Sequence, residues 1–87
     1  EQFHASARIY MQAIKELEKA ISLLEDPVIY DHLGAAYFKT RDLEKAKSNW
    51  EKSLKLNPEQ GEVKQKLKSL DKSMKDDQQH SQKTTVN

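Results

Sequence analysis

The sequence predicts an all-α fold of antiparallel helices, and three observations support this prediction. Apolar residues recur every three or four positions in successive segments, which is the spacing of one face of an α-helix. The chain has only two glycines and two prolines, too few for the many turns of an all-β fold. One helical segment also resembles another that lies 33 residues further along the chain.

Composition excludes several classes of function. The 87 residues predict one domain, and the lack of cysteine rules out disulfides and thiolate metal sites. Lys plus Arg is 15 and Asp plus Glu is 14, so the net charge of +1 gives no general attraction to nucleic acid. No apolar run approaches the roughly 20 residues that span a membrane. We therefore expect a soluble chain with no nucleic-acid partner and no membrane insertion.

The first two helices are predicted at residues 2–24 and 27–39. Asp26-Pro27 marks the start of the second helix, because Asp caps free backbone N–H groups and Pro is tolerated in the first turn. No Gly or Pro interrupts the first helix. Its apolar stripe consists of Ile9, Ala13, Leu17, Ala20, Ile21 and Leu24.

Two further helices are predicted at residues 43–56 and 59–74. Asp42 is the expected N-cap of the third helix, and Asn57-Pro58 repeats the stop-and-start pattern seen at Asp26-Pro27. The apolar stripe of the fourth helix consists of Val63, Leu67, Leu70 and Met74. Residues 76–87 have one aliphatic residue and no periodicity, so we expect a disordered tail there.

An internal repeat connects the first and third helices. At an offset of 33 residues, small and large residues fall in the same places. The matched pairs are Ala13 with Ala46, Leu17 with Trp50, Ala20 with Ser53, Ile21 with Leu54 and Leu23 with Leu56. Residues 27–60 then form a full unit of 34 residues, and residues 2–24 are interpreted as the second helix of a partial unit.

The full unit resembles the tetratricopeptide repeat (TPR), whose pattern is aromatic-x2-Leu-Gly-x2-Tyr, then Ala-x3-aromatic, then Pro. The matching residues are Tyr30, Leu33, Gly34, Tyr37, Ala46, Trp50 and Pro58. The resemblance implies an α-solenoid fragment built from antiparallel helix-turn-helix units over residues 1–75. One departure is Arg41, where the family often has Gly. If this residue is left-handed, it costs roughly 1–2 kcal/mol.

The repeat pattern predicts how the helices pack. Gly34 lies inside a helix, where Gly costs about 1 kcal/mol relative to Ala. We expect it to allow close approach of the paired helix at Ala46. The expected core has Tyr30, Leu33 and Tyr37 interlocked with Trp50 and Leu54.

The two ends of the chain differ in pattern. Continuing the register puts Lys68 at the position of Gly34 and Asp71 at that of Tyr37, so residues 59–74 resemble the capping helix at the C-terminal end of a TPR array. The first predicted helix lacks a preceding partner helix. We therefore expect an open apolar face at Ile9, Ala13 and Leu17, through which the chain forms a homo-oligomer or binds a partner.

The sequence predicts no catalytic, cofactor or metal site. Asp31 and His32 are adjacent on a helix and therefore face different directions, and no nucleophile accompanies them. His80 with Asp76 and Asp77 is better explained as part of the tail, and no phosphate loop or zinc pair occurs. A run of lysines is interpreted as a solvated face, diluted by Glu62 and Asp71; it comprises Lys64, Lys66, Lys68, Lys72 and Lys75.

The TPR resemblance implies a scaffold that binds a peptide or helix of another protein in a concave groove. The implied groove positions are Val28, Asp31, His32, Ala35, Phe38 and Lys39, with Phe38 as the expected anchor. Carboxylate-clamp TPR domains carry Lys, Asn and Arg in the groove, so Asp31, His32 and Ala35 disfavour a chaperone tail as ligand.

Two alternatives remain at this stage. One is a self-assembly module that uses the open N-terminal face. The other is an accessory domain of a larger enzyme or envelope protein. The sequence is similar to bacterial TPR proteins, some of them attached to the cell envelope, and this likeness leaves the compartment open between bacterial cytoplasm and envelope.

Overall fold

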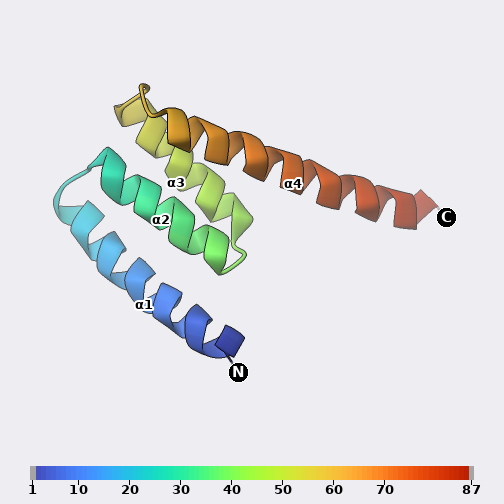
Figure 1. Cartoon of the computed structure of the whole chain (residues 1–87), viewed down its shortest axis with the longest axis horizontal. Helices are drawn as coiled ribbons and strands as arrows, with labels where there is room; N and C mark the ends of the chain where they lie inside the picture. Colours follow the sequence, from blue (N-terminus) through green and yellow to red (C-terminus); the bar gives the residue numbers. More distant parts are fainter. Residues whose placement is uncertain (1, 87) are drawn as a thin grey trace.

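A computed structural model describes the backbone of residues 2–86 and the side chains of residues 6–75. The chain forms four helices: α1 (Gln2–Leu23), α2 (Pro27–Lys39), α3 (Leu43–Leu56) and α4 (Gly61–Val86). Successive helices run in opposite directions, with α1 beside α2, α2 beside α3 and α4 along α3 (Figure 1). All regular structure within residues 2–86 is helical, which confirms the predicted all-α fold.

Helix α2 begins and ends where the sequence predicted. The carboxylate of Asp26 accepts a hydrogen bond from the backbone N–H of Val28 at 2.7 Å, and Pro27 occupies the first turn. At the other end, the backbone N–H of Thr40 donates to the carbonyl of Ala36. Local capping therefore sets both limits of this helix.

The turn between α2 and α3 depends on Arg41, which has a left-handed backbone with a φ of 69°. The N–H of Arg41 donates to the carbonyl of Phe38, and that of Asp42 donates to the carbonyl of Tyr37. These two bonds form a Schellman motif, which satisfies the last carbonyls of α2. Arg41 therefore does have the left-handed backbone that the sequence analysis considered, and this conformation costs roughly 1–2 kcal/mol for a residue other than Gly.

The turn between α3 and α4 corrects the prediction that the last helix starts at residue 59. Asn57 accepts a hydrogen bond from the N–H of Glu59 at 3.2 Å, so Pro58 and Glu59 form a turn and α4 starts at Gly61. The reason is the side chain of Gln60. Its amide donates to the carbonyls of Ser53 and Asn57 and closes the end of α3 before a new helix can begin.

Helix α4 also ends later than predicted. It continues to Val86, which corrects both the expected end at Met74 and the expected disordered tail at residues 76–87 as far as Val86; Asn87 lies outside the described residues. No Gly or Pro follows Gly61, and the Lys and Gln that are frequent here are good helix formers. Missing apolar periodicity therefore did not indicate a lack of helix.

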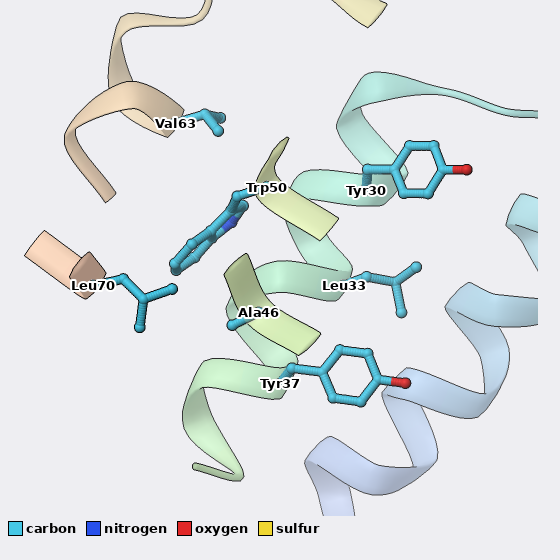
Figure 2. Packing of buried hydrophobic residues seen from close by; sticks show 7 residues of the cluster. All are labelled: Tyr30, Leu33, Tyr37, Ala46, Trp50, Val63 and Leu70. Atoms are coloured by element: carbon cyan, nitrogen blue, oxygen red, sulfur yellow. The ribbon is translucent and has the colours of Figure 1, made fainter. Parts of the chain in front are cut away.

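The core extends across three helix interfaces. Its buried members are Tyr30, Leu33, Tyr37, Ala46, Trp50, Val63 and Leu70. In Figure 2 the two tyrosines and Leu33 point toward α1, whereas Trp50 lies toward Val63 and Leu70 of α4. The tyrosines were expected to interlock with Trp50, but they do not. Helix α2 packs against α1 on one side and against α3 on the other, and the two tyrosines lie on its α1 side (Figure 2).

Gly34 provides the space in which the indole of Trp50 lies. A Cβ atom at Gly34 would lie 2.4 Å from both Cδ1 and Nε1 of Trp50. The sequence analysis placed this close approach at Ala46, which is fully buried but is not among the nearest atoms. The close approach itself is present, and its partner is the indole.

Candidate interaction groove

The candidate site is a hollow between α2 and α4 with a volume of about 410 Å³. Helix α2 contributes one wall, α4 contributes the other, and Trp50 of α3 lies between them. The lining residues are Ala35, Phe38, Lys39, Trp50, Gln65, Lys66, Ser69, Leu70 and Ser73.

Aromatic and aliphatic side chains form the apolar part of the hollow. Trp50 and Leu70 are almost completely buried, with 3% and 1% of their surface exposed. Phe38 remains 38% exposed, and its ring centroid lies 6.0 Å from that of Trp50 with the ring planes tilted by 38°. This is a favourable arrangement of an aromatic pair. The ring of Phe38 therefore packs against Trp50 while part of its surface stays exposed to solvent.

Asp31 connects three helices beneath this hollow. The indole Nε1 of Trp50 donates to the Asp31 carboxylate at 3.0 Å and to its backbone carbonyl at 3.1 Å. The ammonium of Lys66 lies 3.0 Å from the same carboxylate oxygen and 5.9 Å from the centroid of the Trp50 ring. A charge-assisted bond and a cation–π contact therefore hold α4 to α2 and α3.

The structure brings together only part of the predicted groove. Ala35, Phe38 and Lys39 line the hollow, and Asp31 makes internal bonds next to it. Val28 is 55% exposed and His32 is also exposed, but neither lines the hollow.

Sequence reasoning did not assign the α4 wall of the hollow. The residues concerned are Gln65, Lys66, Ser69, Leu70 and Ser73. Because α4 was interpreted as a cap, its polar positions were treated as solvated surface. The available signal was the row Gln65, Ser69 and Ser73, whose spacing of four places them on one side of a helix.

The three residues of the predicted open N-terminal face differ in how far they are exposed. Ile9 is 67% exposed, but Ala13 is half-buried and Leu17 packs against the core. Leu23 and Leu24 at the end of this helix are also exposed. Exposed apolar surface on α1 therefore lies at Ile9, at Met11 and around its C-terminal end.

The opposite side of α2 carries two parallel sets of polar contacts that the sequence analysis did not predict. The hydroxyl of Tyr37 donates to Glu18 at 2.7 Å, and the hydroxyl of Tyr30 donates to Glu25 at 2.8 Å. The ammonium groups of Lys45 and Lys52 lie 5.5 Å and 5.7 Å from the centroids of the Tyr37 and Tyr30 rings, respectively. The Tyr37 set connects α1, α2 and α3, whereas the Tyr30 set connects α2 and α3 to Glu25 in the turn that follows α1.

These contacts change the acidity of both tyrosines. Burial, reinforced by the hydrogen bond to Glu18, raises the pKa of Tyr37 from 10.0 to about 12. The hydrogen bond to Glu25, with burial, raises the pKa of Tyr30. In both cases the neutral hydroxyl is the form that the fold stabilises.

We expect the contribution of Tyr37 to stability to be lost between about pH 10 and pH 12. The folded chain holds the phenolic proton more strongly than the unfolded chain, so this contribution is complete below the unfolded pKa of 10.0 and disappears as pH rises through the folded pKa of about 12. Titration by tyrosinate absorbance should show a late step that Tyr37→Phe removes. If that step survives in Tyr37→Phe, the assignment is wrong.

Comparison with known families agrees with the pattern of α2 and α3. Residues 27–60 match the family described as Tetratricopeptide repeat. This segment is a tetratricopeptide repeat. It covers α2, α3 and the turn before α4. No curated protein and no solved structure shows significant similarity to the chain.

The repeat indicates a module for protein–protein interaction, and such repeats are typically non-catalytic scaffolds. Among the residues that the structure describes, no group of three or more His, Cys, Asp or Glu side chains is placed to hold a metal ion. None of the helices within the described range combines the length and apolar character needed to cross a bilayer.

Proposed function

We propose that this chain binds a segment of another protein in the hollow between α2 and α4. The observation that carries the proposal is Phe38, a large aromatic residue that is 38% exposed at the edge of a concave apolar site. Aromatic residues in such positions contribute much of the binding energy at protein interfaces. The repeat identity of residues 27–60 supports the same class of function.

The fixed position of Phe38 also supports binding. Its ring rests on Trp50, which is itself fixed by two hydrogen bonds to Asp31. An anchor that is already ordered loses little conformational entropy when a partner arrives. Because one repeat and one further helix offer a small surface, we expect weak binding.

Phe38→Ala is expected to abolish partner recovery by this chain while lowering the free energy of unfolding by only about 1–2 kcal/mol, because the ring is partly buried against Trp50. Recovery should be measured by affinity capture, and stability by urea denaturation. The matched control is Leu56→Ala, which removes a 47% exposed side chain on α3 that does not line the hollow. Unchanged recovery with Phe38→Ala would show that the groove is assigned to the wrong surface.

A second candidate function is self-association through the exposed apolar surface of α1. The supporting observation is that Ile9 and Leu24 are both 67% exposed. Sedimentation at increasing concentration separates the two functions, because a peptide-binding monomer keeps its mass and a self-associating chain does not. Ile9→Lys should return an oligomer to the monomer; a monomer at all concentrations would exclude this second function.

A further inference from the structure

We infer that the partner segment is acidic and places one bulky apolar side chain in the hollow between α2 and α4, with its carboxylates facing Lys39. This inference rests on the proposed function and specifies the chemistry of its ligand. Three features of the lining support it: the unbalanced charge at the rim, the apolar base, and a row of hydrogen-bonding side chains along α4.

The charged side chains that line the hollow are of one sign. Its lining contains two lysines, Lys39 and Lys66, and no carboxylate. Lys66 is already paired with Asp31, at 3.0 Å. Lys39 is exposed and has no ion-pair partner among residues 6–75. An acidic ligand complements this remaining charge, and a basic ligand is repelled by it.

The base of the hollow suits one large apolar side chain. Trp50 and Leu70 close it from below, while Ala35 and Phe38 form its α2 side. A volume of about 410 Å³ lies at the lower end of the range of roughly 300–1,000 Å³ for small-ligand sites. That space takes a side chain such as Phe or Leu together with part of the adjoining backbone.

The α4 wall provides polar groups at regular intervals. Gln65, Ser69 and Ser73 follow one another at a spacing of four residues, and all three are exposed. Their amide and hydroxyl groups both donate and accept hydrogen bonds, as the backbone of a bound peptide requires. A segment that runs along α4 would meet this row while its apolar side chain enters the hollow.

The inference is tested with four synthetic peptides of equal length that lack tryptophan. Three carry a central Phe flanked by Glu, by Gln or by Lys, and the fourth carries a central Ala flanked by Glu. Trp50 is the only tryptophan of the chain and lines the hollow, so its fluorescence reports occupancy directly. We expect the Glu-flanked Phe peptide to bind best, and added salt to weaken it. The Ala peptide should be at least about tenfold weaker, because it lacks the Phe side chain that would be buried in the hollow.

Lys39→Gln separates the role in binding from a role in stability. Both Lys39 and Lys55 lie in the last turn of a helix, where a positive charge favours the helix dipole, so Lys55→Gln is the matched control. Lys39→Gln should reduce the affinity for the Glu-flanked Phe peptide by about two- to fivefold, the usual range for an exposed ion pair. Its affinity for the Gln-flanked peptide should not change. Lys55→Gln should preserve the preference for Glu.

The possible failures are distinguishable. If none of the peptides changes the fluorescence of Trp50 or binds by calorimetry, the proposed function fails together with the inference. If the Gln-flanked and Glu-flanked Phe peptides bind equally, the hollow still binds protein segments but the acidic partner is excluded. Equal binding of the Ala peptide would instead overturn the assignment of an apolar anchor.

Discussion

Replacing Trp50 by alanine is expected to lower the free energy of unfolding by about 3–5 kcal/mol, the usual cost of removing a large buried aromatic side chain. Trp50 is 3% exposed and lies where α2, α3 and α4 meet, between Gly34 on one side and Val63 and Leu70 on the other (Figure 2). Small domains have a total stability of only about 5–15 kcal/mol. Urea denaturation followed by far-ultraviolet circular dichroism should show the unfolding transition of this variant shifted to a much lower urea concentration.

The control for this substitution is Trp50→Phe. Phenylalanine retains most of the apolar contact but cannot donate the two hydrogen bonds from Nε1 to Asp31. The Asp31 carboxylate keeps its bond to Lys66, so we expect a smaller loss, of about 1–2 kcal/mol. A Trp50→Ala chain that unfolds within about 1 kcal/mol of the wild type would contradict the central position of the indole.

The same substitution bears on function, because Trp50 belongs to the hydrophobic core and also lines the base of the hollow. The direct ion pairs between α4 and the other helices are Lys66 with Asp31 and Lys47 with Asp71, within the described side chains. Their members are 20–46% exposed, and such pairs contribute only about 0–1 kcal/mol each. Apolar packing of α4 on the core, in which Trp50 takes part, therefore contributes more to the docking of this helix than the ion pairs do, and its loss would leave one wall of the hollow poorly positioned.

Helices α2 and α3 could be predicted to the residue because their limits depend on local chemistry. Asp26 and Asp42 cap the helices that follow them, and Pro27 occupies a first turn that needs no backbone donor. The start of α4 could not be predicted in the same way. Its position depends on Gln60, whose amide reaches back seven residues to Ser53.

The candidate site was predictable only on its α2 wall. The TPR resemblance placed Phe38 in the groove, and it lines the hollow. The same resemblance also placed Asp31 in the groove. Spacing along α2 cannot show that this carboxylate is already bonded to the indole of Trp50 and to Lys66, which lies 35 residues further along the chain. The contact of Tyr37 with Glu18 requires the antiparallel placement of α1, which no local pattern specifies.

Gly34→Ala is expected to lower the free energy of unfolding by about 1–3 kcal/mol, although alanine is the better helix former by about 1 kcal/mol. The added Cβ would lie 2.4 Å from two atoms of the Trp50 ring, so the indole has to move. It cannot move freely, because it is hydrogen-bonded to Asp31 and enclosed by Val63 and Leu70.

The matched control is Gly61→Ala at the start of α4, where an added Cβ meets no atom within 4 Å. There we expect no loss, and a gain of up to about 1 kcal/mol from the reduced entropy of the unfolded chain. Combining Gly34→Ala with Trp50→Phe should cost less than the sum of the two single substitutions, because the smaller ring leaves room for the methyl group. Strict additivity in urea denaturation would mean that the two side chains are not in contact, and the packing of α2 against α3 would then have to be assigned to other residues.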